Sequence, residues 1–461
     1  MVSAYIASAI GAPEGAIKLL LSIFAGYPLA LLHRLPLFYA APSLVKHLLL
    51  FLEGASICYY NFGIDTVHMW LNVTIIYLLV LLCGGTKFSV IFAFVFNTCY
   101  LLIGYYTQVP FQDFGISWTM PHCVLTLRLT GVAFDYYDSK RRTAGNDVEL
   151  TEKPGYLEML GHTFFFGGVL VGPQFSLKRY LNFVNGKYTD RKTGGGPKSV
   201  HASLEKLAVG VFYLGMFQLL ALYIPDSYLT SPSFHELGFL TKCALITIWG
   251  KNALHKYVGV WLIQEGSIIL TGMSYNGVEE KGVAKWDGCT NIKVWQLETG
   301  ESFSDFIQSF NVNTNQWMAR YVYKRLRFLG SKVLSQLLTL LYLALWHGLL
   351  SGYYMCFFLE LLLTHAELQA KHILGQLHIF GNFKRLTILD LFGRFIRKTL
   401  LMFLWSYSLV SFVLLQTEKW MSVYWSVYFA GHISCLLVIA VAHALHAVKK
   451  SKPLANGVHL D

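Results

Sequence analysis

The stretch "VLSQLLTLLYLALWHGLLSGYYMCFFLELLLT", residues 333–364, contains a single charged residue, Glu360, and places His347 near its middle. A helix needs about 20 predominantly apolar residues to cross a bilayer. We therefore expect this stretch to enter a membrane and to hold more than one helical element. An ionisable side chain at membrane depth costs free energy and is usually paired or functional. His347 is accordingly the first candidate functional residue.

The composition of the whole chain agrees with this stretch. The 461 residues are 54% hydrophobic and 14% charged, and the mean hydropathy is +0.47. Soluble domains carry about 25% charged residues. Segments in a bilayer must satisfy their own backbone hydrogen bonds, as helices or closed barrels do. The apolar runs are continuous and do not alternate with polar residues, which favours helices over a barrel. The sequence thus predicts an all-α polytopic membrane protein.

The apolar runs predict roughly eleven spanning or half-spanning helices in one domain that covers residues 1–461. No internal repeat of useful period is visible. The predicted segments lie near 17–32, 37–60, 66–84, 88–106, 118–134, 156–175, 205–224, 238–272, 333–364, 390–416 and 424–448. The wide segments 238–272 and 333–364 are each expected to hold more than one element.

The net charge of +11 is concentrated between the apolar runs, for example at residues 140–142 and 320–327. This pattern is typical of cytoplasmic loops under the positive-inside rule, and it also suits lipid head groups or the phosphates of a soluble cosubstrate. A nucleic-acid partner is not predicted, because the basic residues are not spread over a folded soluble surface. Eight cysteines without a CxxC pair predict neither a metal site nor a disulfide framework.

Three polar stretches interrupt the apolar runs. Residues 138–154 and 184–199 are rich in Gly, Lys and Asp and predict surface loops. Residues 275–332 differ, because aromatic residues recur among their charges. We expect short amphipathic helices at the membrane interface there.

A continuous helix through His347 would place Ser351 and Tyr354 on the same face as the histidine. Gly348 and Gly352 would leave room for a ligand or another helix to approach. The pattern indicates the lining of a tunnel. Position alone leaves two roles open for His347, namely a hydrogen-bonded structural histidine and a functional one.

A second cluster lies upstream in "SFNVNTNQWMAR", residues 309–320, where Asn311, Asn313 and Asn315 alternate with other residues. An asparagine amide is costly in a dry environment unless it is paired. If the segment is helical, Asn311 and Asn315 share a face. The alternative is a cap or turn at the start of the basic segment "RYVYKRLR".

Taken together, these blocks carry a family resemblance. "WHG" followed by "SGYY", with the asparagine block upstream, is similar to the membrane-bound O-acyltransferase (MBOAT) family. "GPQFSLKRY" (172–180), "WDGCTNIKVW" (286–295) and "ARYVYKRLRFLGSK" (319–332) resemble its lysophospholipid acyltransferase branch. The resemblance covers about residues 17–450. It implies a helical bundle around an intramembrane reaction chamber.

The resemblance also implies roles for particular positions. It identifies His347 as the catalytic base and Asn311 as its polar partner. A wider set of candidates for substrate binding comprises Asn315, Trp317, Arg320, Lys324, Arg327, Trp346, Ser351 and Tyr354. The basic members of this set are candidates for the phosphates of acyl-CoA, although ordinary positive-inside topology also accounts for them.

The implied substrates are acyl-CoA, as cosubstrate, and the free sn-2 hydroxyl of a lysophospholipid, with polyunsaturated acyl groups preferred. No separate cofactor or metal is implied. The expected location is the endoplasmic reticulum membrane, among membrane lipid, and the sequence leaves homo-oligomer formation open.

The proposed chemistry needs these residue types. A hydroxyl is a poor nucleophile until a base removes its proton, and an imidazole with a pKa of about 6.5 can do so at cellular pH. An amide N–H can orient the acceptor or stabilise the developing oxyanion. Acyl transfer by this route needs no covalent enzyme intermediate.

Two other functions remain open from the sequence. A transporter could use the buried histidine as a proton relay, but such proteins usually carry further intramembrane charges, and few are present here. An acyltransferase could also use a different acceptor, such as a sterol, a diacylglycerol or a protein.

Overall fold

The computed structural model describes residues 2–108, 116–141, 150–188, 198–280, 282–376 and 388–451. Apart from an isolated bridge between Val278 and Ala284, all regular elements in these ranges are helices, which confirms the all-α prediction. In chain order they are α1 (Val2–Ile10), α2 (Glu14–Leu32), α3 (Pro36–Ala40), α4 (Ser43–Phe62), α5 (Thr66–Cys83), α6 (Lys87–Gln108), α7 (Thr119–Lys140), α8 (Tyr156–Thr163), α9 (Leu177–Val184), α10 (Val200–Ala221), α11 (Pro232–His235), α12 (Phe239–Thr271), α13 (Val294–Thr299), α14 (Phe303–Ser309), α15 (Val312–Tyr321), α16 (Lys332–His347), α17 (Ser351–Gln376), α18 (Ile388–Leu414), α19 (Thr417–Ser426) and α20 (Ala430–Ser451), with short 3₁₀ helices η1 (Gly63–Asp65), η3 (Asp226–Thr230) and η4 (Tyr323–Leu329).

Six helical segments in the described part of the chain are long and apolar enough to cross a membrane, which confirms the polytopic prediction. Several other predicted segments form helices inside the bundle. Helix α7, for instance, is buried along nearly its whole length, and α16 has only 16 residues. The six segments are Glu14–Leu32, Ser43–Cys83, Lys87–Gln108, Val200–Thr230, Phe392–Leu414 and Ala430–Ala447.

Three predicted segments test how many elements a long apolar run contains. Segment 333–364 contains two helices, as expected, but 238–272 forms the single helix α12, so the expectation of more than one element there was wrong. The predicted helix over 156–175 was also wrong, because α8 ends at Thr163 and residues 164–176 are irregular. Glycines and a proline in "GGVLVGP" disfavour a helix in this part of the segment.

The predicted loops near 138–154 and 184–199 fall largely on residues 142–149 and 189–197, which lie outside the described residues. The stretch 275–332 holds α13, α14, α15 and η4, which confirms the expected short helices.

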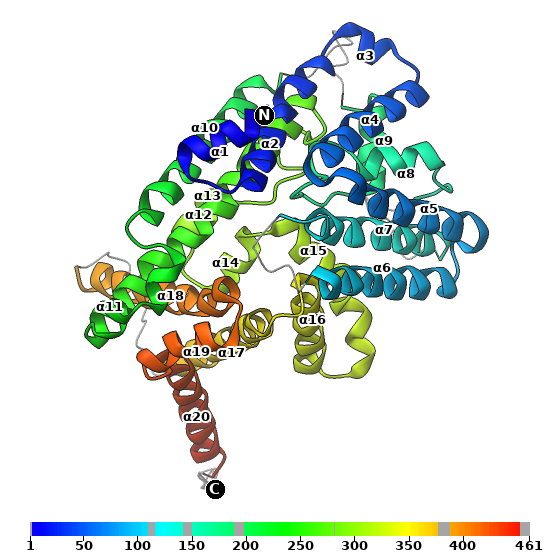
Figure 1. Ribbon diagram of the computed structural model, residues 1–461. Helices are drawn as coiled ribbons and strands as arrows, with labels where there is room; N and C mark the ends of the chain where they lie inside the picture. The colour runs from blue at the N-terminus through cyan, green and yellow to red at the C-terminus, as the bar shows by residue number, and fades with distance from the viewer. Residues whose placement is uncertain are drawn as a thin grey trace, which may run out of the picture.

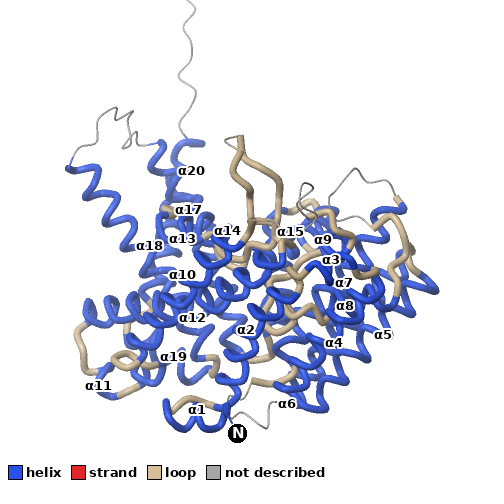
Figure 2. The backbone as a smooth tube through the Cα atoms, turned by 90° about the horizontal axis from the view of Figure 1, so that it is seen from above, coloured by secondary structure: helices blue, strands red, loops and turns tan. Residues whose placement is uncertain are grey.

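The helices form two groups with α14 and α15 between them (Figure 1). Helices α2, α10 and α12 run side by side in one group, and α4 to α9 form the other. Helices α14 and α15 keep this position in the view from above (Figure 2). Helix α17 packs against α14, α16 and α18, and α18 packs against α12. Helix α20 projects away from the body towards the C-terminus in Figure 1. This arrangement leaves an interior bounded by α7, α12, α14, α17 and α18.

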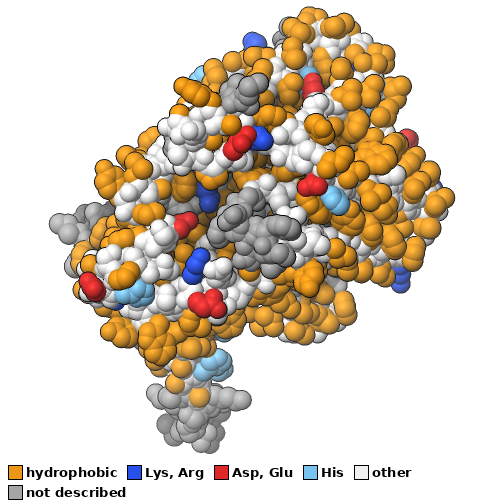
Figure 3. Space-filling view, viewed as in Figure 1, with side chains coloured by type: hydrophobic (Ala, Val, Ile, Leu, Met, Phe, Trp, Pro, Cys, Tyr) orange, Lys and Arg blue, Asp and Glu red, His pale blue; other side chains and the backbone are white. Residues whose placement is uncertain are grey.

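The outside of the molecule is strongly apolar. Many large hydrophobic side chains are exposed on the predicted spans, such as Leu82, Ile103 and Leu222. Hydrophobic side chains cover much of the margin of the face drawn in Figure 3, and several charged side chains lie towards its middle. Exposed apolar surface of this extent is typical of a lipid-facing surface.

The irregular segment 164–176 is held by a buried cation. The guanidinium of Arg128, on α7, donates to the backbone oxygens of His162, Thr163, Gly168 and Pro173 at 2.9–3.2 Å. A buried charge is tolerated only when its hydrogen bonds are satisfied. Arg128 therefore fixes the backbone that forms one wall of the interior cavity described next.

Candidate active site

A cavity of about 690 Å³ lies in this interior, and both His347 and Asn311 line it. Its wall comes mainly from α7, α12, α14, α15, α16, α17 and α18, together with residues 170–174. The wall is predominantly apolar and aromatic, with a few polar groups. Ligand sites in proteins usually have this character. The two residues singled out from the sequence therefore share one cavity.

His347 is the last residue of α16, and Gly348 explains why the helix ends there. Gly348 has φ of +149°, a conformation that residues with a Cβ rarely adopt. A Cβ at this position would also lie 2.9 Å from the Tyr353 ring. The prediction of a continuous helix through His347, with Ser351 and Tyr354 on its face, was wrong for this reason. The break places the histidine at the edge of the cavity.

The hydrogen bond of His347 defines its tautomer. Nδ1 lies 2.8 Å from the backbone oxygen of Leu343, one turn back in α16. A carbonyl oxygen can only accept, so Nδ1 carries the proton and the lone pair of the neutral ring is on Nε2. No described residue forms a hydrogen bond with Nε2. This nitrogen is thus available to a ligand in the cavity.

Aromatic rings surround the imidazole. The ring centroids of Trp346, Tyr353, Phe357 and Phe412 lie 4.6–5.7 Å from that of His347. These rings pack around the imidazole and restrict its orientation. None of these four side chains is a carboxylate that could pair with the histidine.

Asn311 immediately precedes α15 and has a left-handed backbone conformation, with φ +48° and ψ +47°. Asparagine tolerates this region better than most residues with a side chain. It occupies the N-cap position, yet its side chain makes no capping hydrogen bond. The expectation that Asn311 and Asn315 share a helix face is therefore wrong, because Asn311 lies outside the helix.

The other two asparagines have structural partners. The amide of Asn313 donates to the backbone oxygen of Thr290 at 2.8 Å. The amide of Asn315 donates to the backbone oxygens of Ile307 and Phe310 at 2.6 and 2.9 Å. Within the described ranges, Asn311 alone of the three has a side chain without a hydrogen bond. Its amide is thus the one left for a ligand.

Another asparagine, Asn291, performs the capping that Asn311 does not. Its backbone oxygen accepts from the N–H of Val312 at 2.9 Å, and its Oδ1 accepts from the N–H of Asn313 at 3.2 Å. These are two of the N–H groups that a helix start leaves unpaired. The side chain of Asn311 is consequently free of that role.

Asn291 is held in turn by a buried acid. Oε1 of Glu265, on α12, accepts from the backbone N–H groups of Asn291 and Ile292 at 2.6 and 2.9 Å. Its other oxygen pairs with Nζ of Lys206 at 2.9 Å. Glu265 is 1% exposed. A chain of contacts therefore connects α10 and α12 to the backbone that positions Asn311.

The wider set of predicted binding residues divides into two groups. Asn315 and Trp346 line the cavity, and the indole of Trp346 donates to the backbone oxygen of Cys123 at 2.8 Å. Trp317, Ser351 and Tyr354 are not part of its lining.

The structure gives two of these residues other contacts. The indole of Trp317 donates to the backbone oxygen of Leu127 at 2.9 Å. The hydroxyl of Ser351 lies 2.7 Å from that of Thr417 and accepts from the indole of Trp420. Both residues thus join helices to each other.

The predicted basic residues lie outside the cavity wall. A guanidinium nitrogen of Arg320 lies 3.7 Å from Oδ1 of Asp135, on α7. Lys324 and Arg327 are exposed on η4. The basic cluster was visible in the sequence. That Arg320, Lys324 and Arg327 do not line the cavity is visible only in the structure.

Several lining residues were not singled out from the sequence. Tyr353, Phe357 and Phe412 enclose His347, while Lys256 and Glu360 are the charged residues of the wall. The spacing 353, 356/357, 360 and 363/364 follows one face of a helix and was a usable signal for α17. It was obscured because His347 was assigned to the same helix.

Chemically, the site combines an imidazole with a free lone pair, an amide donor, and an apolar enclosure. These groups suit proton abstraction and the stabilisation of a developing negative charge. The long aromatic and aliphatic wall suits a lipid chain.

The comparisons with known proteins agree with this class of site. The family model for the membrane-bound O-acyltransferase family matches residues 101–413. A human protein named Lysophospholipid acyltransferase 5 is 42% identical over 455 residues, which are 97% of this chain and 93% of the relative. Its namesake from Drosophila melanogaster is 37% identical over 456 residues, covering 96% and 89% of the two chains. The mouse Membrane-bound glycerophospholipid O-acyltransferase 1 is 27% identical over 428 residues, covering 87% and 83%.

The chain therefore belongs to the membrane-bound O-acyltransferase family. The resemblance inferred from its sequence motifs is confirmed at this level.

Proposed function

We propose that this protein is an acyl-CoA-dependent lysophospholipid acyltransferase, acting on lysophosphatidylcholine and related lysophospholipids at the sn-2 hydroxyl. The observation that carries the proposal is the presence of His347 and Asn311 on the wall of one cavity inside the helical bundle. The names of the relatives support the class of acceptor. A preference for polyunsaturated acyl chains and a location in the endoplasmic reticulum membrane are parts of the same proposal.

In the proposed mechanism, Nε2 of His347 removes the proton of the acceptor hydroxyl as its oxygen attacks the thioester carbonyl. The new ester C–O bond forms, and the tetrahedral oxyanion accepts a hydrogen bond from the amide of Asn311. The C–S bond then breaks, and the CoA thiolate leaves with the proton returned by His347. Each group acts from its observed position on the wall.

The two substrates differ in where they come from. Acyl-CoA has a soluble head rich in phosphate and a long apolar tail, whereas the lysophospholipid is held in the bilayer. The apolar cavity suits the acyl chain, and the exposed cations Lys324 and Arg327 are the proposed contacts for phosphates. No additional cofactor or metal takes part in this proposal.

The alternative, a transporter that uses His347 as a proton relay, has no specific observation in its favour. The four side chains nearest to the imidazole are aromatic, and the Tyr353 hydroxyl is the one titratable group among them.

The proposal can be tested by measuring release of free CoA thiol from arachidonoyl-CoA by the purified protein, with and without lysophosphatidylcholine. We expect release only when the lysophospholipid is present. We also expect phospholipase A2 to remove the transferred chain from the product, as it does for sn-2 esters. Absence of thiol release with several lysophospholipids and several acyl-CoAs would contradict the proposal.

A further inference from the structure

Glu360 is an acidic residue on the cavity wall that the proposed mechanism does not use. It is half-buried, and its carboxylate forms no hydrogen bond or ion pair with any residue in the described ranges. A carboxylate in an apolar environment costs free energy unless a partner compensates it. The described residues supply no such partner, so a ligand is the natural source.

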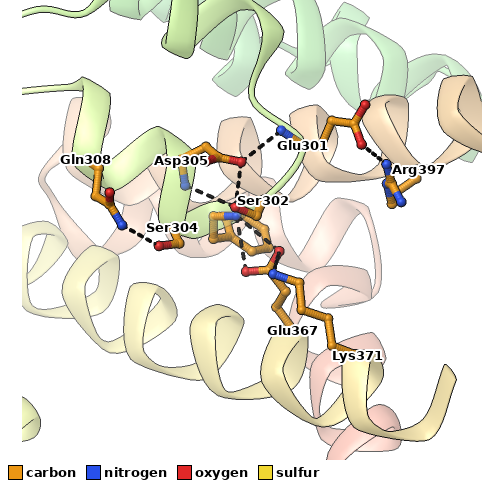
Figure 4. Close-up of polar contacts among 9 residues, drawn as sticks. Glu301, Ser302, Ser304, Asp305, Gln308, Glu367, Lys371 and Arg397 are labelled. Atoms are coloured by element: carbon orange, nitrogen blue, oxygen red, sulfur yellow. Dashed lines mark hydrogen bonds and ion pairs between the residues drawn. The ribbon is translucent and has the colours of Figure 1, made fainter. Parts of the chain in front are cut away.

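Its neighbour on α17 shows the contrast. Glu367 lies two helical turns further along the same face of the helix. Its carboxylate accepts from the backbone N–H of Phe303 at 3.2–3.3 Å and pairs with Lys371 at 3.2 Å (Figure 4). Glu367 thus fixes the start of α14, and the adjacent Glu301 pairs with Arg397. The acids at this rim are satisfied structurally, whereas Glu360 is not.

The cavity wall to which Glu360 belongs is rich in aromatic residues. Phe303 and Phe310 from α14 and its C-terminal end, and Trp405 from α18, line the same cavity. The rings of Phe303 and Trp405 stack with centroids 6.4 Å apart, and Phe310 contacts Trp261 at 5.1 Å. Aromatic faces combined with a carboxylate recognise quaternary ammonium groups by cation–π and charge attraction.

The charges of the wall also match one class of ligand. Lys256 is the other charged residue of the lining; it stands 5.1 Å above the Tyr257 ring and forms no ion pair with Glu360. A wall with one charge of each sign complements a zwitterionic head group, which carries a phosphate and an ammonium.

The position of Glu360 fits the length of such a head group. Tyr353 and Phe357, which contact the imidazole of His347, lie on the same face of α17 as Glu360. From the helical rise, Glu360 lies roughly 5–10 Å along the axis from these two residues. A glycerophosphocholine unit has its ammonium a comparable distance from its sn-2 hydroxyl.

We propose that Glu360 binds the cationic ammonium group of the acceptor's head group and so selects lysophospholipids that carry choline or ethanolamine. This inference rests on the proposed acyltransferase function and adds the residue that determines its acceptor class. Glu360 is a specificity-determining residue here and takes no part in proton transfer.

The test removes two charges separately, the carboxylate of Glu360 by mutation and the ammonium of the ligand by an uncharged analogue. The ligands are lysophosphatidylcholine and its 3,3-dimethylbutyl analogue, in which a carbon replaces the choline nitrogen and the shape is kept. We expect kcat/KM of the wild type to favour the choline ligand by about tenfold or more. In Glu360→Gln this preference should fall to within about twofold, mainly through a higher KM for the choline ligand.

Controls separate the possible outcomes. Glu418→Gln removes a carboxylate from an exposed position on α19 and should keep the wild-type preference. Glu360→Met provides a second, apolar variant of similar size if the amide variant does not fold, and it should lose the preference in the same way.

Three results would overturn the inference: a wild type that uses both ligands equally, a Glu360→Gln that keeps the wild-type preference, or a variant that changes only the KM for acyl-CoA. Failure of the proposed function looks different, because the wild type would then release no thiol with either ligand.

Discussion

At the scale of single residues, Asn311 combines an unusual backbone conformation with a free side chain. We predict that Asn311→Asp, which keeps the shape but replaces the N–H donor by an oxygen, lowers kcat by about 10²–10³-fold. Asn311→Gly, which suits the left-handed backbone and removes the amide, should lower kcat similarly. The measurement is lysophospholipid-dependent thiol release beside a thermal unfolding curve for each variant.

Both variants should unfold close to the wild type, because Asn291 and not Asn311 caps α15. An active Asn311→Gly would show that the amide does not contribute to the reaction.

The sequence was informative about these residues to different degrees. His347 and the asparagine block drew attention because a histidine and an asparagine are costly in apolar surroundings. Their position left structural roles open, and the family resemblance implied the roles of His347 and Asn311. Glu360 was visible as the one charge in its stretch, but its lack of a partner depends on what α14 and α18 present to it. The break at Gly348 could have been anticipated, since glycine directly after a helix is a common stop signal.

At the scale of helices and their contacts, Glu265 connects α10 and α12 to the start of α15. We predict that Glu265→Ala lowers both stability and kcat, because it leaves two backbone N–H groups and Lys206 without their acceptor. Losing one partner of a buried charged contact costs about 3–5 kcal/mol. Unfolding midpoints and kcat of the purified variants measure both effects.

Glu265→Gln keeps an oxygen that can accept from the N–H groups and should lie between Ala and wild type. Lys206→Met, which leaves the carboxylate its two N–H donors, should have the smallest effect on kcat. If Glu265→Ala kept the wild-type kcat, this network would not contribute to the position of Asn311.

The start of α14 offers a pH-dependent test at the same scale. The Ser302 hydroxyl donates to Asp305 at 2.7 Å and lowers the pKa of that carboxyl below its ordinary value. It also accepts from the N–H of Asp305 at 3.1 Å, which caps the helix (Figure 4). We predict that Ser302→Ala destabilises the protein by about 1 kcal/mol near pH 7.

The sign of the pH dependence follows from the lowered pKa. A depressed carboxyl pKa stabilises the fold above the unfolded value of about 3.9 and loses this contribution as the pH falls through the folded value. The difference between wild type and variant in unfolding midpoint should therefore shrink in acid, leaving the cap contribution. A difference that grows in acid would contradict the assignment.

The helices were predictable from continuous apolar runs, and the all-α class of membrane bundle was correct. Against roughly eleven predicted spanning or half-spanning helices, six segments in the described part of the chain are long and apolar enough to cross a membrane. The positions at which a helix breaks or continues were predicted less well. Helix α12 continues through Lys251, His255 and Lys256, since buried contacts with α10 and α18 tolerate polar residues that suggest a break. Segment 164–176 is apolar yet irregular, because its glycines and proline disfavour a helix and the buried Arg128 donates to the backbone oxygens of Gly168 and Pro173. The glycines and the proline are visible in the local sequence, but the long-range contacts of Arg128 and of α12 are not.

At the scale of the whole molecule, the apolar exterior should contact lipid. We predict that Ile103→Arg, on the exposed face of α6, reduces the yield of folded, membrane-integrated protein, because an arginine in a spanning helix costs about 2.5–3.5 kcal/mol. Phe328→Arg is the matched control, since it is exposed among the basic residues of η4 and should be tolerated. Size-exclusion profiles of detergent extracts give the yields. Equal yields would mean that this face of α6 does not meet the bilayer core.

His347 is the proposed base at the junction of the two substrates, and the proposed function requires it more than any other residue. The most direct test is lysophospholipid-dependent thiol release from arachidonoyl-CoA by purified wild type and His347→Ala, each confirmed as folded and monodisperse. Loss of a general base costs about 10²–10⁴-fold, and we predict a fall in kcat of at least that size. Turnover of His347→Ala at the wild-type rate would contradict the account.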